Sequence, residues 1–188
     1  AVRQLIGWKR GLPELRNESK RDLFAFLGTK HERRAAEACE GRLRSRYRLK
    51  ALQEASSRLD YGENLAVLEA LERALGQENL PSALRVVDVG AKNWSTVCAV
   101  ERFFRHHGDQ NRDVELDGVE IDAHGMYPDF HSRHDYALAY AAQTQNPKAC
   151  YWAEDFLQFD RGGYDVVLCM YPFLTRYALL QWGLPLHL

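Results

Sequence analysis

Short apolar runs alternate with helical patterns in the second half of the chain, and this alternation limits the fold more than any other feature. The runs are LRVVDV at residues 84–89, then 114–122, 149–155 and a fourth that begins at residue 164. Helical patterns at 95–107 and 132–143 separate the first three. The alternation predicts an α/β fold with a doubly wound, mostly parallel sheet of Rossmann type and helices on both faces. The fourth run is continuously apolar, which is typical of a strand covered on both faces.

The first 80 residues show helical patterns and no strand pattern. Residues 19–22 could cap a short helix over 23–27, and Thr29 with Glu32 forms a second capping box. A single helical face is then predicted from apolar residues spaced three or four apart: Ala36, Cys39, Leu43, Tyr47, Ala51 and Ala55. A leucine stripe over 65–75 predicts a further helix that ends at Gly76. We therefore expect a helical cap over 1–80 and a Rossmann-like domain over 81–188.

The composition predicts a cytoplasmic protein. No run of about 18 apolar residues occurs, so no membrane span is expected, and residues 1–16 lack the apolar stretch of a secretory signal. Scattered cysteines without a CxxC pair favour free buried thiols over two disulfides: Cys39, Cys98, Cys150 and Cys169.

Three histidines lie close together in the sequence. His124, His131 and His134 with Cys150 could be considered as zinc ligands, but no second paired motif supports this, and we expect no metal. His131 is also a candidate general base.

Charge is divided unevenly along the chain. Residues 1–50 hold 14 Lys and Arg against 6 Asp and Glu, whereas the remainder holds 11 against 20. Two interpretations stay open for the basic run at 42–50. It could contact the phosphates of a nucleic acid, or the basic front half could dock on the acidic back half.

The turn after the first run carries Asp88, Gly90, Ala91 and Asn93 and lacks the GxGxxG pattern of a pyrophosphate site. Asp88 at a strand end would repel phosphate and attract a cation. S-adenosylmethionine fits these requirements because it carries an ammonium, a sulfonium and a carboxylate but no phosphate. A structural interpretation also applies, since Asp88, Asn93 and Ser95 are types that cap helices.

Residues with suitable chemistry follow the other predicted strands. Glu120, beside Ile121, could accept hydrogen bonds from both ribose hydroxyls. Asp155 could accept from an adenine amino group, and Phe156 could pack on the ring. The fourth strand is followed by residues that would face the reactive end and an acceptor pocket: Met170, Tyr171 and Phe173.

Residues 84–173 resemble the first half of a class I, Rossmann-like S-adenosylmethionine-dependent methyltransferase. The acid-x-Gly motif of the family matches Asp88-Val89-Gly90, although Lys92 and Trp94 replace its later glycines. Its second and third acids match Glu120 and Asp155. Where the amino-methylating branch has (D/N)PP(Y/F), this chain has MYPF at 170–173, so adenine or glutamine amino methylation is not supported.

The resemblance implies methyl transfer from S-adenosylmethionine to an unidentified acceptor. The family sheet has seven strands, and only four are evident here, so the fourth would lack a partner on one side. The terminal LPLHL at 184–188 could supply a fifth strand, two chains could pair, or the domain could be truncated. The alternatives are an inactive methyltransferase-like binding or dimerisation module, a nicotinamide-dependent enzyme, and a nucleic-acid-binding function of the basic helix.

Overall fold

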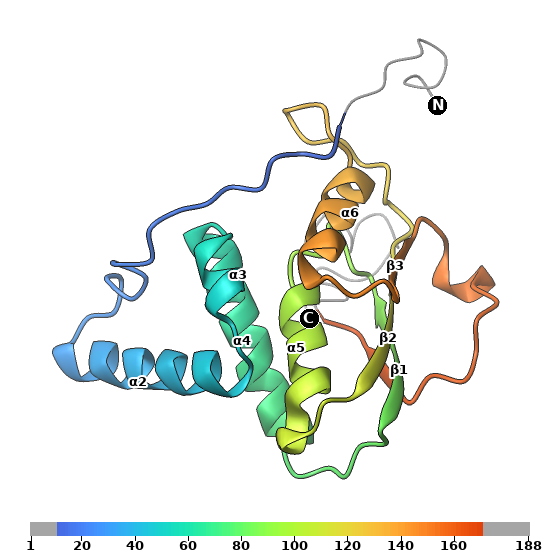
Figure 1. Cartoon of the computed structure of the whole chain (residues 1–188). Helices are drawn as coiled ribbons and strands as arrows, with labels where there is room; N and C mark the ends of the chain where they lie inside the picture. The colour runs from blue at the N-terminus through green and yellow to red at the C-terminus, as the bar shows by residue number, and fades with distance from the viewer. Residues whose placement is uncertain (1–10, 171–188) are drawn as a thin grey trace, which may run out of the picture.

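A computed structural model describes residues 11–170, and its centre is a four-stranded sheet (Figure 1). All neighbouring strands are parallel and follow the order β3-β2-β1-β4. The strands are β1 (Ala83–Val89), β2 (Asp113–Val119), β3 (Ala149–Trp152) and β4 (Val166–Leu168). The predicted α/β class and parallel sheet are therefore confirmed. The second and third strands end earlier than predicted, so Glu120 and Asp155 lie just after them.

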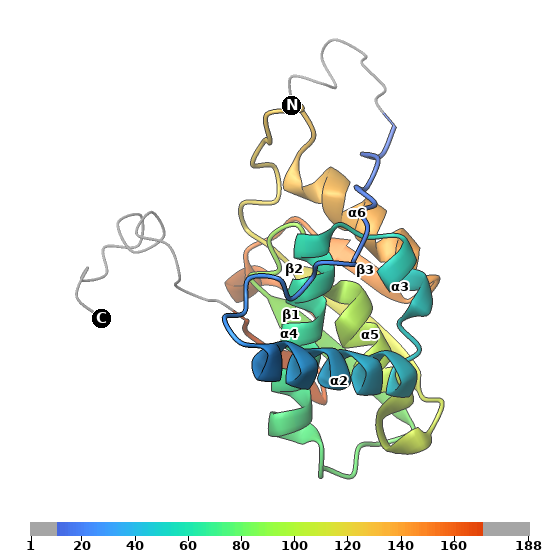
Figure 2. The ribbon, with the colours of Figure 1, turned by 90° about the vertical axis from the view of Figure 1, so that its left-hand side faces the viewer.

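Residues 11–170 form five α-helices, which precede the sheet or lie between its strands in the sequence. They are α2 (Lys30–Arg46), α3 (Lys50–Glu54), α4 (Arg58–Leu75), α5 (Val97–His106) and α6 (Arg133–Thr144). Two short 3-10 helices are η1 (His107–Asp109) and η2 (Phe156–Gln158). Figure 2 shows α4, α5 and α6 side by side in front of the strands, with α2 crossing α4. Helix α5 packs against both α4 and α6, so these three helices form one layer on one face of the sheet.

The N-terminal helices follow the sequence pattern in part. The Thr29 capping box is confirmed: its hydroxyl accepts from Glu32 N at 3.1 Å, and the Glu32 carboxylate accepts from Thr29 N at 2.9 Å. Gly76 ends α4 as predicted. The continuous helical face over 36–55 is wrong, because Arg48 adopts a left-handed φ of 55° and separates α2 from α3.

The predicted helix over 23–27 is also wrong. Residues 21–26 form consecutive turns whose backbone hydrogen bonds span three residues, such as Leu23 N to Lys20 O at 3.1 Å. Five residues are too few to nucleate a helix without tertiary support. The Lys20 ammonium instead donates to the carbonyls of Glu18 and Ser56, which ties the segment to the turn before α4.

Helices and sheet share one hydrophobic core. A single cluster of buried residues extends from Leu43 in α2 through Leu65 and Leu68 in α4 to Leu116 in β2 and Leu168 in β4. Within the described residues no helix is long and apolar enough to cross a membrane. All four cysteines are free as predicted, but Cys98 alone is buried, so the expectation of buried thiols is wrong for Cys39, Cys150 and Cys169.

The basic run of α2 pairs with acidic residues of this same chain. Arg42 and Arg46 both bind the Glu72 carboxylate of α4, at 2.7 Å and 3.1 Å, and Arg44 lies 3.3 Å from Glu40. These ion pairs favour the interpretation in which the basic front half docks on acidic residues of the later helix.

The second face of the sheet is covered differently. Within residues 11–170 it carries no α-helix; the segment 153–165 between β3 and β4 lies over it (Figure 1). Val167 in β4 is 58% exposed, so the prediction of a fourth strand covered on both faces is wrong for the described part of the chain. The predicted LPLHL strand and the residues Tyr171 and Phe173 lie outside the described residues.

Candidate functional site

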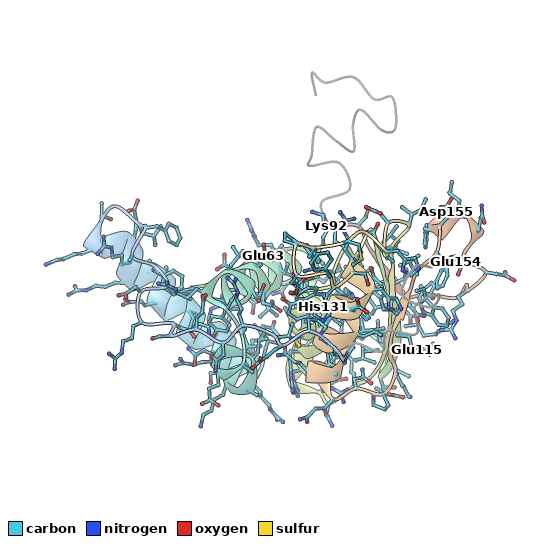
Figure 3. All side chains as sticks on the ribbon, turned by 90° about the horizontal axis from the view of Figure 1, so that it is seen from above. Glu63, Lys92, Glu115, His131, Glu154 and Asp155 are labelled. Carbon is cyan, nitrogen blue, oxygen red and sulfur yellow. The ribbon has the colours of Figure 1, made fainter. Side chains whose placement is uncertain are left out.

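The carboxyl ends of the parallel strands lie at one edge of the sheet, where ligands bind in folds of this kind. Figure 3 looks down on the molecule from this side and shows Lys92, His131 and Asp155 there. Glu63 and Lys92 lie toward the α4 side, and Asp155 lies on the opposite side beside Glu154. The turn after β1 is the central feature of this edge.

The turn after β1 contains three left-handed residues but only one glycine. Gly90, Lys92 and Trp94 have φ values of 73°, 51° and 56°. Left-handed backbone is unfavourable for residues with a Cβ, so contacts from elsewhere must hold Lys92 and Trp94. The amides of Gly90 and Ala91 both donate to Val119 O, at 2.9 Å and 3.2 Å, which fixes the start of the turn on β2.

Two side chains hold the backbone of Lys92. Its N–H donates to Glu120 Oε2 at 2.9 Å, and its carbonyl accepts from the Tyr151 hydroxyl of β3. The Trp94 ring fills the space above Gly118, where an added Cβ would lie 2.6 Å from Trp94 Cε2. The missing glycines of the turn are therefore replaced by side-chain contacts and by a glycine in the neighbouring strand. Sequence reasoning missed this, although a glycine inside a strand often marks a close approach.

Glu120 is buried, and its carboxylate accepts hydrogen bonds from two backbone segments, the turn after β1 and the residues after β2. Its Oε2 accepts from Lys92 N, and its Oε1 accepts from Asp122 N at 2.8 Å. Each carboxylate oxygen keeps a further lone pair for another donor. Ile121 next to it is 56% exposed.

A cavity of about 210 Å³ lies between this turn and the start of α4. Five residues predicted from the sequence line it: Asp88, Gly90, Ala91, Asn93 and Met170. Six others line it that were not among the predicted cofactor-binding residues: Leu59, Asp60, Glu63, Lys92, Ser95 and Thr96. The α4 contribution could not be expected from the sequence, because the carboxylates of that helix lie some 25 residues before the turn that they face.

Asp88 is the most unusual of these side chains. It is 2% exposed, and burial raises its pKa to about 7, with the Glu120 charge adding to the rise. The nearby Trp94 indole opposes the rise, although its Nε1 has no partner of standard hydrogen-bond geometry in the described part of the chain. Burial and Asp60 likewise raise the pKa of Glu63. A cation placed in this cavity would relieve both groups.

Four predicted residues do not line this cavity. Glu120 and Ile121 lie beyond the turn, and Asp155 caps η2 by accepting from Leu157 N at 3.0 Å. Phe156 is 38% exposed and contacts Phe159 with ring centroids 6.3 Å apart. The edge therefore contains an acidic cavity near α4 and, separately, the residues that follow β2 and β3.

The capping roles considered for Asn93 and Ser95 are not observed. Neither Asn93 nor Ser95 caps α5, which begins after Thr96 without a side-chain cap; Asn64 of α4 accepts from Ala99 N at 3.0 Å instead.

His131 pairs through Nδ1 with Asp129 at 2.9 Å, and Tyr136 donates to the same carboxylate. In residues 11–170 no group of three metal-ligating side chains converges.

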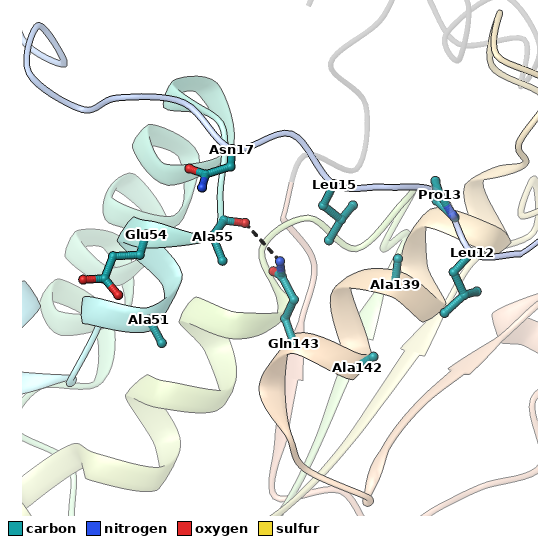
Figure 4. Close-up of a pocket in the computed structure, with 10 residues that line it drawn as sticks. All are labelled: Leu12, Pro13, Leu15, Asn17, Ala51, Glu54, Ala55, Ala139, Ala142 and Gln143. Atoms are coloured by element: carbon teal, nitrogen blue, oxygen red, sulfur yellow. Dashed lines mark hydrogen bonds between the residues drawn. The ribbon is translucent and has the colours of Figure 1, made fainter.

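A second, larger cavity of about 570 Å³ lies elsewhere, between the N-terminal segment, α3 and α6 (Figure 4). Gln143 spans it by donating to Ala55 O at 3.1 Å. Most of its lining is alanine, leucine and proline, and it shares no residue with the acidic cavity. It is an open seam between helices and contains little to orient a polar ligand.

Comparison with known proteins gives structural likeness only. No protein-family model and no curated protein matches the chain. A Listeria monocytogenes protein assigned to the class I S-adenosylmethionine-dependent methyltransferases is similar in structure, with a TM-score of 0.42 and 18% identity over 79% of this chain and 48% of that one. An amino pentose methyltransferase of calicheamicin biosynthesis from Micromonospora echinaspora, solved with S-adenosylmethionine, gives 0.31 and 21% over 77% and 43%. The chain spans less than half the length of each structure.

Proposed function

We propose that the carboxyl edge of the sheet binds S-adenosylmethionine and that the chain takes part in methyl transfer to an acceptor. The observation that carries this proposal is the buried Asp88 carboxylate, which faces a small cavity with two more carboxylates, Asp60 and Glu63. Their combined charge exceeds that of Lys92, the cation in the same lining. Such a cavity disfavours a phosphate and suits the ammonium group of the ligand, while the positive charge of Lys92 would attract the ligand's carboxylate.

The remaining residues fit a nucleoside that extends from this cavity. A volume of about 210 Å³ is below the roughly 300 Å³ of pockets that enclose whole ligands, so it would take only the amino-acid end. Gly90 leaves open space at the turn, since an added Cβ would meet nothing within 4 Å. Glu120 keeps lone pairs for ribose hydroxyls, and Asp155 and Phe156 would lie toward the base. The bound group would supply an electrophilic methyl on a sulfonium.

The residues of this chain would act by positioning. Methyl transfer requires the acceptor to approach in line with the sulfur–carbon bond, so holding the two partners in place supplies most of the catalysis. Binding at Asp88 would also favour loss of the proton that burial retains there, because the ammonium offsets the carboxylate charge. Met170 also lines the cavity, and in this proposal it lies near the approach of the acceptor.

Calorimetric titration with S-adenosylhomocysteine tests the proposal. We expect saturable binding that Glu120→Ala abolishes and that Glu37→Gln, on the exposed surface of α2, leaves unchanged. Asp88→Asn should weaken the binding of S-adenosylhomocysteine more than the binding of 5′-methylthioadenosine, because the second compound lacks the amino-acid end. Absence of heat at high micromolar ligand would refute the proposal. Fluorescence enhancement of NADH instead would indicate the nicotinamide alternative, and binding without turnover of any acceptor would indicate the binding module.

A further inference from the structure

Asp117 is a fully buried carboxylate in the middle of the sheet. It lies in β2 in register with Val87 of β1 and Cys150 of β3, and none of its surface is exposed. Side chains alternate along a strand, so Asp117 faces the opposite side from Leu116 and Gly118, away from the helices. Aspartate is disfavoured in strands, and a buried charge is costly unless it is paired.

Three side chains satisfy this carboxylate. Trp152 Nε1 donates to Oδ1 at 2.6 Å, the Tyr164 hydroxyl donates to Oδ2 at 2.7 Å, and Arg161 lies 3.2 Å from both oxygens. An ionised carboxylate has about four acceptor positions, so these contacts use nearly all of them. The pairing with Arg161 makes the hydrogen bonds charge-assisted.

The donors come from the two ends of one segment. Trp152 is the last residue of β3, whereas Arg161 and Tyr164 lie just before β4. Arg161 also stacks over the Trp152 ring at 4.4 Å, which joins the two ends directly. Asp155 and Phe156 lie in the loop between them. One carboxylate therefore ties both ends of the segment 153–165, and closing a loop removes much of its conformational freedom.

A second set of contacts ties the same segment to β1. Arg85 N donates to Asp165 Oδ2 at 2.8 Å, and the Arg85 guanidinium donates to Gly162 O at 2.5 Å and stacks over the Tyr164 ring at 4.9 Å. These contacts hold only the later part of the segment. The part with Asp155 and Phe156 is held through Asp117 and the rings of Phe159 and Trp152, whose centroids are 5.9 Å apart.

We infer that Asp117 is a positioning residue that fixes the segment between β3 and β4 on the second face of the sheet and thereby places Asp155 and Phe156 at the carboxyl edge. The ligand consequence rests on the proposed function. With the segment held, Asp155 can accept from an adenine amino group in a defined direction; with it released, the base loses that partner. The assignment explains why a charged residue occupies a buried strand position.

Hydrogen exchange tests the positioning without any ligand. Arg161→Gln and Tyr164→Phe each remove one partner of Asp117 from partly exposed side chains, so both variants should fold. We expect amides of 154–160 to exchange about tenfold faster in each, the effect of losing one hydrogen bond, with α4 amides unchanged. Arg42→Gln and Tyr136→Phe remove the same chemical groups elsewhere and should leave 154–160 unchanged. Equal exchange of 154–160 in wild type and both test variants would overturn the inference.

A base-selectivity measurement tests the consequence. Wild type should bind S-adenosylhomocysteine more tightly than S-inosylhomocysteine, because the second compound lacks the amino group from which Asp155 would accept a hydrogen bond. Arg161→Gln should reduce this preference by about tenfold, and Arg42→Gln should keep it. If wild type binds neither compound, the proposed function fails, while the exchange result still decides the role of Asp117. If Arg161→Gln keeps the full preference, Asp117 does not position the base-contacting residues.

Discussion

Leu116 and Asp117 are neighbours in β2, yet they face opposite sides of the sheet and meet different surroundings. Leu116 packs into the hydrophobic core on the helix-covered face, and Asp117 is surrounded by Trp152, Arg161 and Tyr164 on the other. Neither side chain is exposed. Equally buried side chains therefore serve different ends on the two faces. Apolar packing is non-directional and stabilises the fold, whereas hydrogen bonds with fixed geometry place one particular segment.

The largest effect is expected on the helix-covered face. Leu116→Ala should lower the free energy of unfolding by about 2 to 5 kcal/mol, because it removes buried methyl groups and leaves a cavity. Urea denaturation measures this. Leu157→Ala is the control, since that side chain is 88% exposed and should change stability by less than about 0.5 kcal/mol. Similar losses for the two variants would show that the face is not a packed core.

A smaller loss is expected where β2 meets the turn. Gly118→Ala should cost about 1 to 3 kcal/mol, because its Cβ would lie 2.6 Å from Trp94 Cε2 and displace the ring. Gly41→Ala in α2 is the matched control: its Cβ meets nothing within 4 Å, and alanine favours helix. The two variants should move the urea midpoint in opposite directions. A neutral Gly118→Ala would mean that the turn does not depend on Trp94.

The second face should respond more weakly in stability. Asp117→Asn keeps the side-chain volume but loses the charge opposite Arg161 and one acceptor oxygen, at a cost of about 1 to 2 kcal/mol. Thermal unfolding checks this value. A loss as large as that of Leu116→Ala would contradict the contrast between the two faces, because it would make the polar face an equal source of stability.

The smallest expected effect is a pH dependence at the cavity. Asp88 has a folded pKa of about 7 against an ordinary value of 3.8, so its contribution to stability is full below about pH 4 and is lost as the pH rises through 7. Between pH 6 and 8, wild type should lose about 1 kcal/mol relative to Asp88→Asn. Urea unfolding at each pH measures the difference. The lowered pKa of His106 also makes stability depend on pH, but this residue is present in both proteins, so its contribution cancels in the difference between them. A wild type that loses no stability relative to Asp88→Asn between pH 6 and pH 8 would disprove the claim that burial raises the pKa of Asp88.

Sequence patterns anticipated the features that depend on neighbouring residues. The Thr29 capping box and the Gly76 terminus are local, and the structure contains both. The order of strands and helices after Leu84 could also be predicted, because hydrophobic periodicity is set over a few residues. The helix over 23–27 failed for the converse reason. Its sequence pattern suits a helix, but the Lys20 ammonium donates to the carbonyls of Glu18 and Ser56 instead. A helix prediction from neighbouring residues cannot include the contact with Ser56, which lies 36 residues away.

The candidate site was predictable only in part. Asp88, Gly90 and Met170 could be found because they lie at or just after the ends of strands, and all three line the cavity. Asp60 and Glu63 could not, because only the packing of α4 against α5 brings them to the turn. Tyr151 was missed as well, since its hydroxyl meets the Lys92 carbonyl across two strands.

The class of fold and the residue types at the ends of the strands could be predicted without the structure, because strand and helix periodicities are properties of short stretches. Three features became visible only once the chain was folded: a glycine in β2 makes room for Trp94, α4 supplies two of the cavity's carboxylates, and Asp117 holds the segment after β3. These features join residues distant in sequence, and a buried group's partners become known only when the chain has folded around it.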